Sequence, residues 1–366
     1  MSHICLDQCV AHTEADCPSY SSPASESPNR IEVSVIVPVH NAEPYLEECL
    51  LSVTKQKCIS LRTVQVIVYD DGSTDRSSKK AMNVLRYIKD NEEECNLGGF
   101  LIISREGPTG CGSARNRACE HATGDVFVFL DADDIMLPNR LARNVEAVRK
   151  YPDRIIGSSF QRSPSNATPR YTKYHRNLRN DELEYYAFRD APLAMPTIAC
   201  HRKVFERIGG FREGLGVPED LHFCYDFLRK GGKFFKLSGP LVIYRWHENM
   251  LSHSLHRKTL LKVRVAAFED IVLPRWEHFS IWGAGRDGKD CYKALSEKGR
   301  QKVREFIDID PNKLGAKRLY GKDVVHFSTA VAPLVTCVAL DRTNGEFEAN
   351  LHLCGFRIGK DCIPLV

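Results

Sequence analysis

Residues 126–141 read VFVFLDADDIMLPNRL and join a short apolar segment to a cluster of acidic side chains. The apolar run Val126–Leu130 predicts a strand that is buried on both faces. Three carboxylates follow it directly: Asp131, Asp133 and Asp134. At the end of a buried strand these groups repel one another and lose hydration, so they need a counter-charge, which a divalent cation supplies. The same residues also suit an Asp-rich turn that caps the next helix, and this stretch alone does not decide between the two.

Three further apolar segments precede this stretch, and each runs into a polar loop and then into a pattern of helical spacing. Strands are predicted at 31–39, 63–69 and 100–104, and helices at 43–53, 75–89 and 115–122. Strands that alternate with helices predict an α/β domain with a parallel sheet. The ligands of such a sheet bind at the carboxyl ends of its strands, and all of these polar loops lie at that edge.

The loops carry residue types that suit a nucleoside diphosphate. Asp71 can accept a hydrogen bond from a base imide or a ribose hydroxyl, although an Asx turn at the start of a helix explains it equally well. Arg115 can pair with a phosphate, and Gly110 and Gly112 let main-chain amides approach the same group at a helix N-terminus. The order of these loops along the chain is a stronger indication than any one of them.

Four segments in this order resemble the inverting glycosyltransferase family 2: VSVIVPVHNAEPYLEECLLSV, VYDDGSTD, GCGSARNRA and FLDADD. The resemblance covers about residues 32–141 and implies a GT-A fold, a sugar-nucleotide donor, and a Mn²⁺ or Mg²⁺ ion on the DxD carboxylates. A hard dication suits this chemistry because it stabilises the charge that develops on a departing diphosphate. The implied nucleotide-sugar contacts are Pro38, Asn41, Glu43, Asp71, Arg115 and Asp131. The implied metal ligands from DADD are Asp133, Asp131 and Asp134.

The acceptor half of the domain is expected at 158–274. It begins with a Ser-, Pro- and Asn-rich segment, 158–169, that is typical of a linker. Glu219 and Asp220 open a predicted helix, where acidic residues are often only caps favoured by the helix dipole. The resemblance, an ED pair after a GGF turn, implies that Asp220 is the general base and that Glu219 supports it. The predicted strand 241–247 ends in YRWH, and the same resemblance implies that His247 completes the metal shell or contacts the diphosphate.

The middle third of the chain is basic. Residues 160–264 contain 19 lysines and arginines but only 10 aspartates and glutamates, whereas the whole chain has a net charge of +4. Within it, basic residues alternate with tyrosines, a pattern that can combine phosphate contacts with base stacking. A solvated surface without a partner explains the same pattern. The candidate RNA contacts are Arg170, Lys173, Arg176 and Arg179, interleaved with Tyr171 and Tyr174.

The chain divides into three parts at this level. Residues 1–30 are polar and rich in Ser and Pro, which predicts a disordered leader, and residues 31–274 form the GT-A domain. Residues 275–366 predict a small Rossmann-like α/β domain, because a strand runs into GAGRDG and a helix, with Asp308 and Asp310 about 20 residues further on. Whether this domain binds a ligand or RNA, or serves only as a packing scaffold, stays open.

Composition narrows the class of protein. With 43% hydrophobic and 27% charged residues the chain has the make-up of an ordinary globular protein. It lacks the apolar run of roughly 18 residues that would predict a membrane span, and it shows no signal-peptide pattern. Its 14 cysteines include no CxxC pair, which favours reduced thiols. The sequence therefore predicts a cytoplasmic protein without a membrane partner.

The acceptor is suggested by segments beyond the shared motifs. GVPEDLHFCYDFLRKGG, YRWH and PRWEHFSIWGAGRDGKDCYKAL resemble a branch of family 2 that acts on RNA. This resemblance implies UDP-galactose as the donor and queuosine, in the anticodon of tRNA-Tyr, as the acceptor. The alternative is a UDP-N-acetylglucosamine-dependent β-1,3-glycosyltransferase that acts on a glycan or a protein. No motif in the chain reports which hydroxyls of the donor sugar are read.

Overall fold

The structure is a computed structural model that describes residues 2–5, 11–13, 31–91, 95, 97–250, 255–315, 318–338 and 343–366. It contains two compact units. The first comprises Met1–Asn177, Leu193–Phe223 and Gly232–Glu248. The second comprises Leu178–Pro192, Cys224–Gly231 and Asn249–Val366. The second unit thus takes in more of the chain than the predicted domain at 275–366, because a helix and two short segments pack with the C-terminal sheet.

The first unit is built on a sheet of ten strands in the order β2-β1-β5-β4-β3-β6-β9-β8-β10-β7. Its parallel part holds β3 (Val33–Val39), β4 (Val64–Asp70), β5 (Gly99–Ser104) and β6 (Val126–Phe129). Each of the first three leads into a helix: α1 (Leu46–Thr54), α2 (Ser77–Asp90) and α3 (Cys111–Glu120). The predicted parallel α/β sheet is confirmed.

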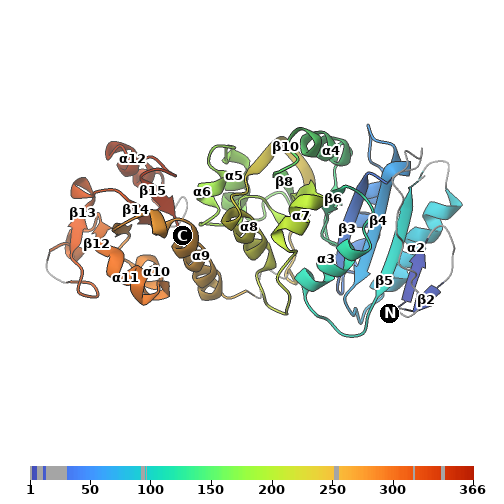
Figure 1. The fold of residues 1–366 in the computed structure, drawn as a ribbon, viewed down its shortest axis with the longest axis horizontal. Coiled ribbons are helices and arrows are strands. Elements are labelled where there is room, and N and C mark those ends of the chain that lie inside the picture. Colours follow the sequence, from blue (N-terminus) through green and yellow to red (C-terminus); the bar gives the residue numbers. More distant parts are fainter. Residues whose placement is uncertain are drawn as a thin grey trace. The chain divides into compact units, whose positions relative to one another are not determined.

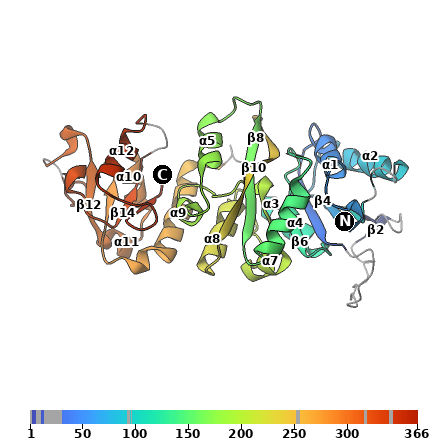
Figure 2. The ribbon, with the colours of Figure 1, turned by 90° about the horizontal axis from the view of Figure 1, so that it is seen from above.

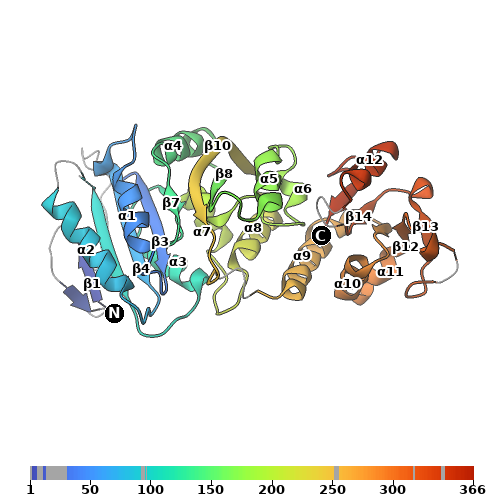
Figure 3. The ribbon, with the colours of Figure 1, turned by 180° about the vertical axis from the view of Figure 1, so that it is seen from behind.

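Helices cover both faces of this sheet. The valines of β3 pack with apolar residues of α1, α2 and α4 (Arg140–Lys150) in one hydrophobic core. Figure 3 shows α1 and α2 in front of the strands, and Figure 1, from the opposite side, shows α3 in front of them. Apolar β-branched strands buried on both faces leave only the strand ends to carry polar groups, so the polar loops gather at the carboxyl edge.

The other half of the sheet is mixed. β9 (Ala199–His201) pairs antiparallel with β6 and with β8 (Ile155–Ser163), β8 pairs in parallel with β10 (Phe234–Arg245), and β10 pairs antiparallel with β7 (Ile135–Met136). Part of the predicted linker at 158–169 is therefore wrong. Ser158 and Ser159 are buried within β8, where their small side chains fit against neighbouring strands. The remaining elements are η2 (Leu61–Thr63), α5 (Pro169–Asn177), η3 (Met195–Thr197) and α7 (Arg202–Ile208). α8 (Glu219–Arg229) begins in this unit, and its residues from Cys224 on belong to the second.

Most of the predicted leader lies outside the described residues. Within it, two short strands, β1 (Ser2–Cys5) and β2 (Ala11–Thr13), add to the edge of the sheet next to β5. This differs from a leader without any strand. The physical reason is that an edge strand presents unpaired main-chain N–H and C=O groups, which an extended segment of almost any composition can satisfy.

The second unit contains a parallel sheet of five strands in the order β13-β12-β11-β14-β15. Its strands are β11 (Phe279–Trp282), β12 (Val303–Asp308), β13 (Val324–His326), β14 (Leu334–Thr336) and β15 (Cys362–Pro364). Numbered by chain position this is the Rossmann order 3-2-1-4-5, so the predicted Rossmann-like domain is confirmed.

The helices of this unit are α6 (Leu183–Tyr186), α9 (Arg257–Ile271), α10 (Arg286–Ala294), α11 (Glu297–Lys302) and α12 (Glu346–Leu353). Short 3₁₀ turns complete it: η5 (Leu273–Arg275), η6 (Pro311–Lys313) and η7 (Phe327–Thr329). Figure 2 shows α10, α11 and α12 around β12 and β14. Across the described ranges of both units, no helix is long and apolar enough to cross a membrane.

Candidate active site

The first two polar loops of the sheet are tied to each other. Asn41, just after β3, accepts a hydrogen bond through Oδ1 from the main-chain N–H of Thr74 at 2.8 Å. Glu43 accepts one from the N–H of Arg76 at 3.1 Å and pairs with its guanidinium at 2.7 Å. These hydrogen bonds to Arg76 lower the pKa of Glu43. Pro38 lies within β3 and is buried. The predicted nucleotide-side residues of the first loop therefore brace the loop after β4.

Asp71 joins the second loop to the third. Its side chain is 3% exposed, and its carboxylate accepts hydrogen bonds from the N–H of Thr109 at 2.9 and 3.0 Å and from the Thr109 hydroxyl at 2.8 Å. The N–H of Gly110 donates to the same carboxylate at 2.8 Å. Four short contacts fix the glycine-rich loop against β4. Base recognition by Asp71 stays a prediction, and what the structure gives this residue is a role in shaping the loop.

Arg115, on the first turns of α3, connects the two carboxylate motifs. Its side chain is 2% exposed, and it donates to Asp131 Oδ1 through Nη2 and to Glu219 Oε1 through Nη1, both at 2.6 Å. The sequence predicts a phosphate partner for this arginine, whereas the structure gives it two carboxylates. Fork-shaped donors suit such a bridge, because each guanidinium nitrogen can serve a different acceptor.

Glycine residues allow this bridge to form. A Cβ atom at Gly110 would collide with the carbonyl of Gly214, and one at Gly112 would collide with the carbonyl of Arg212. The glycines thus let the chain just before α8 lie directly on the start of α3. The absence of a Cβ at these positions thus serves the contact with the main chain of residues 212–214, and the approach of a phosphate to the Gly110 and Gly112 amides stays a prediction.

The three DADD carboxylates have different surroundings. Asp131 contacts Arg115, and burial, opposed by the charge of Arg115, raises the pKa of this carboxyl. Asp134 is fully buried and accepts from the N–H of Arg245 at 2.8 Å, while its Oδ2 has no hydrogen-bond partner. Burial and the charges of Asp133 and Asp131 raise the pKa of Asp134 well above its usual range. Asp133 lies 2.9 Å from Nε2 of His247, measured from Oδ2.

These residues fit a metal ion that is shared with a substrate. In the described part of the chain, no group of three or more His, Cys, Asp or Glu side chains is arranged to hold a metal by itself. Asp131 and Asp134 have partners of their own, which leaves Asp133 and His247 as the pair in contact. Mg²⁺ in nucleotide sites is commonly held by one or two protein carboxylates together with phosphate oxygens. The raised carboxyl pKa values and the orphaned Oδ2 of Asp134 are features that a nearby dication would relieve.

Three residues that the sequence did not mark as part of the site, Tyr45, Arg245 and Glu48, hold this pair in place. The ring of Tyr45 stacks on the imidazole of His247, with ring centroids 4.7 Å apart and an interplanar angle of 21°. The guanidinium of Arg245 lies 5.5 Å from the Tyr45 ring, donates to the carbonyl of Asp133 at 3.0 Å and pairs with Glu48. Tyr45 lies in the motif EPYL and Arg245 in YRWH, so both stand in segments that resemble the family. The two segments are about 200 residues apart, and no local sequence pattern predicts that they meet.

The proposed base lies at the start of α8, as predicted. Glu219 is 7% exposed and is held by Arg115. Asp220 is half-buried, and its Oδ1 accepts a hydrogen bond from the N–H of Leu221 at 2.7 Å. Through Arg115, the ED pair and the DxD motif therefore lie at one edge of one sheet. Whether Asp220 acts as the base stays a prediction, since its capping contact suits either role.

The predicted RNA contacts divide into two groups. Arg170, Lys173 and Arg176 are exposed along α5, whereas Arg179 pairs with Asp181 and Glu182. The expected stacking does not suit Tyr174, which is buried. Tyr171 is half-buried and packs on Phe160 and His175, because residues three and four apart share the inner face of α5.

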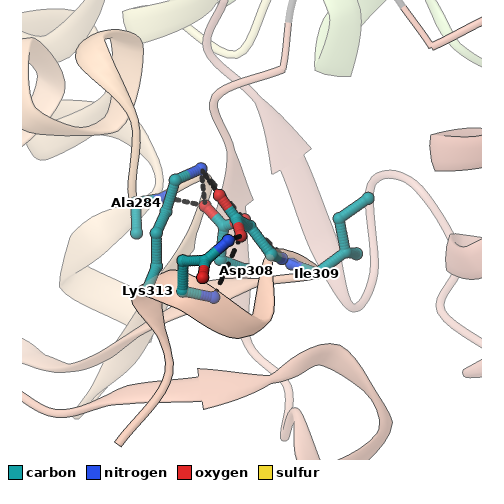
Figure 4. Close-up of polar contacts among 6 residues, drawn as sticks. Ala284, Asp308, Ile309 and Lys313 are labelled. Carbon is teal, nitrogen blue, oxygen red and sulfur yellow. Dashed lines mark hydrogen bonds and ion pairs between the residues drawn. The ribbon is translucent and has the colours of Figure 1, made fainter. Parts of the chain in front are cut away.

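The second glycine-rich loop does not fit a dinucleotide. Asp308, at the end of β12, accepts from the N–H of Ala284 at 2.9 Å, from the N–H of Ile309 at 2.9 Å and from Lys313 at 3.1 and 3.2 Å (Figure 4). In dinucleotide sites an acidic residue at this position binds the ribose. Here the carboxylate of Asp308 is instead hydrogen-bonded to the glycine-rich loop and to the segment that follows β12. Asp287 adds a carboxylate to the first turn of α10, where a pyrophosphate would need a positive field. Asp310 caps η6.

Residues 34–209 match the family model described as Glycosyl transferase family 2. The match covers just under half of the chain and supports a family 2 glycosyltransferase domain. The chain is 24% identical over 276 residues to the uncharacterized glycosyltransferase EpsJ of Bacillus subtilis (strain 168), covering 71% of this chain and 74% of the relative. It is 35% identical over 113 residues to an uncharacterized glycosyltransferase of Haemophilus influenzae, covering 31% of this chain and 40% of the relative. It spans 60% of a similar protein of Rickettsia typhi, with 25% identity.

Solved structures support the same fold. S. aureus TarS (1-349), in complex with UDP-GlcNAc, has a TM-score of 0.53 at 20% identity and covers 66% of this chain and 68% of its own. The mannosyltransferase PcManGT from Pyrobaculum calidifontis, in complex with GDP-Man and Mn²⁺, has a TM-score of 0.50 at 22% identity and covers 66% and 64%. The predicted GT-A fold is confirmed, and the family supports sugar-nucleotide-dependent glycosyl transfer as the class of activity.

Proposed function

We propose that this chain is a metal-dependent inverting glycosyltransferase that moves galactose from UDP-galactose to queuosine in the anticodon of tRNA-Tyr. The observation that carries the site assignment is the bridge of Arg115, 2.6 Å from Asp131 of the DxD motif and 2.6 Å from Glu219 beside the proposed base. It joins a donor-side and an acceptor-side motif that lie about 90 residues apart in sequence. The matching family and the GT-A neighbours support the donor class.

The chain's own residues supply the remaining chemistry. Asp133 and His247 would hold the divalent cation, which on binding stabilises the diphosphate as it leaves. Asp220 accepts the proton of the acceptor hydroxyl while that oxygen bonds to the anomeric carbon and the bond from this carbon to the diphosphate breaks. A single displacement of this kind inverts the anomeric centre. Arg115 holds Glu219, and through it the first turn of α8, in the position that Asp220 needs.

The acceptor is proposed on two grounds. The segments around Asp220, Trp246 and the second glycine-rich loop resemble the queuosine-specific branch of the family. The exposed residues Arg170, Lys173 and Arg176 also give α5 a basic face that suits phosphate contacts. With a tRNA acceptor, the proposed site of action is the cytoplasm. The competing proposal is transfer of N-acetylglucosamine to a glycan or protein, and the UDP-GlcNAc complex of TarS is the observation that favours it.

Labelled UDP-sugars test this proposal directly. The full chain is incubated with Mn²⁺ and bulk tRNA, either containing or lacking queuosine, with and without a chelator. The expected result is galactose in queuosine-containing tRNA alone, lost when the metal is chelated. Label from UDP-N-acetylglucosamine in N-acetyllactosamine or a peptide, with none in RNA, would establish the competing function.

The assignment of the base is tested separately. Asp220→Asn removes the proton acceptor and should lower kcat by about 10²- to 10⁴-fold while UDP binding stays within about twofold of wild type. Asp226→Asn on the same helix is the matched control, because Asp226 pairs with Arg229 at the other end of α8. Full turnover by the Asp220 variant would show that another group takes the proton.

A further inference from the structure

Trp246 lies between two residues of the proposed donor site, and its own side chain was assigned no role. The indole is 37% exposed, one of the few large apolar side chains at the surface of the described residues. Its main-chain N–H donates to the carbonyl of Ser163 at 2.8 Å, so the pairing of β10 with β8 continues to this position. The indole can lie on either face of the sheet, and the contacts of its neighbours distinguish the two.

The contacts of its neighbours decide the face. Arg245 and His247, on either side of Trp246, both contact the ring of Tyr45. Side chains along an extended strand alternate between the two faces, so the residues at 245 and 247 share one face and those at 244 and 246 share the other. Trp246 therefore lies on the face of Tyr244, away from Tyr45.

That face also carries the start of α5. Arg162 lies over the ring of Tyr244 at 3.9 Å and over the ring of Tyr171 at 5.6 Å, and its Nε donates to the Thr168 hydroxyl at 2.9 Å. Arg162 thus fixes the first turn of α5 to the side of β10 on which Trp246 lies. Figures 1 and 2 both show α5 beside β8. An exposed indole and a helix with a basic outer face are in this way brought to the same edge.

The charged side chains of the segment that contains α5 are all basic. Residues 160–180 contain no Asp or Glu. Arg170, Lys173 and Arg176 are exposed and lie three residues apart, so they share one face of α5. Proteins that bind unpaired RNA combine aromatic side chains, on which bases stack, with cations that follow the phosphates. A neutral glycan would contact the indole but would gain no ionic contact from these cations.

We propose that Trp246 and the basic face of α5 form a platform for an unpaired nucleotide that flanks the acceptor, with its base on the indole and its phosphates on Arg170 and Lys173. This inference deepens the proposed function and rests on it for the identity of the RNA. It places the stacking on Trp246, which is more exposed than Tyr171 and Tyr174 and lies next to His247.

Direct binding tests the platform. The probe is an anticodon stem-loop RNA without queuosine, titrated with the full chain at fixed salt. Trp246→Ala should weaken binding by about 5- to 150-fold, the range for loss of one stacked base. Trp246→Phe keeps an aromatic face and should recover most of the affinity. UDP binding should be unchanged in both. Tyr87→Ala, at a tyrosine that is 45% exposed on α2, is the matched control and should leave RNA binding intact.

The charged part has its own measurement. Replacing Arg170 and Lys173 with Ala should reduce the slope of log K against log salt by about 1.4, the value for two lost phosphate contacts on a single strand. Equal RNA binding by wild type, Trp246→Ala and Trp246→Phe would overturn the proposal. So would a loss of UDP or N-acetyllactosamine binding in Trp246→Ala while RNA binding stays normal. Because binding is read without transfer, RNA binding that depends on Trp246 in a protein that never glycosylates tRNA would refute the function and leave the platform standing.

Discussion

The bridge of Arg115 predicts a large loss of stability when its charge is removed. Arg115→Met keeps most of the side-chain volume but leaves the carboxylates of Asp131 and Glu219 without their counter-charge. The arginine is 2% exposed and the Glu219 side chain 10% exposed, so water cannot replace what is lost. Removing one partner of a buried ion pair costs about 3–5 kcal/mol. The Asp131 side chain is 24% exposed and recovers part of its hydration, so the expected cost is about 3 kcal/mol.

A matched control lies on the same helix. Arg117 is 47% exposed and pairs with Glu120, so Arg117→Met should cost no more than about 1 kcal/mol. Urea-induced unfolding of both variants at neutral pH provides the comparison. A double variant, Arg115→Met with Glu219→Gln, should recover about 1–2 kcal/mol of the loss, because it also removes one uncompensated charge. The reasoning fails if Arg115→Met and Arg117→Met unfold at the same urea concentration.

Three further outcomes are expected. Burial, with Lys236 and Arg162 nearby, lowers the pKa of His175 from 6.5 to about 3. Because the folded protein keeps His175 neutral, the free energy of unfolding is unaffected by this group above pH 6.5 and falls by about 1.4 kcal/mol for each pH unit below it. His175→Phe should remove this part of the pH dependence, measured as the difference in unfolding free energy between pH 8 and pH 5. Tyr45→Ala removes the stack on His247 and should raise the Mn²⁺ concentration needed for half-maximal UDP binding by about 2- to 10-fold, with Tyr45→Phe near wild type; equal metal dependence would exclude a positioning role. Asp308→Ala should cost about 2–3 kcal/mol, because it strands the buried N–H of Ala284, whereas Asp323→Ala at an exposed pair should be neutral; similar thermal unfolding of the two would contradict a structural role.

The sequence by itself determined the elements and their order. Apolar β-branched runs such as Val33–Val39 formed strands, and residues with helical spacing formed the intervening helices. The turn chemistry at Asp71, the DxD motif after β6 and the start of α8 at Glu219 were all readable. The family match covers Asp71 and the DxD motif and ends at residue 209, before α8. These features follow from periods of two and 3.6 residues and from local capping, which act between residues close in the chain.

Partner choice was decided only by the tertiary structure. Arg115 pairs with Asp131 and Glu219, which lie far from it in sequence, and glycines let residues 212–214 approach α3. Ser158 forms part of a strand because its neighbours supply the hydrogen bonds that its composition did not predict. Tyr171 turns inward while Trp246 reaches solvent, since the face of each depends on what packs against its element. These ion pairs, strand pairings and side-chain orientations depend on contacts between residues far apart in sequence. A local sequence pattern does not determine which of two equally suitable partners a residue contacts in the folded protein.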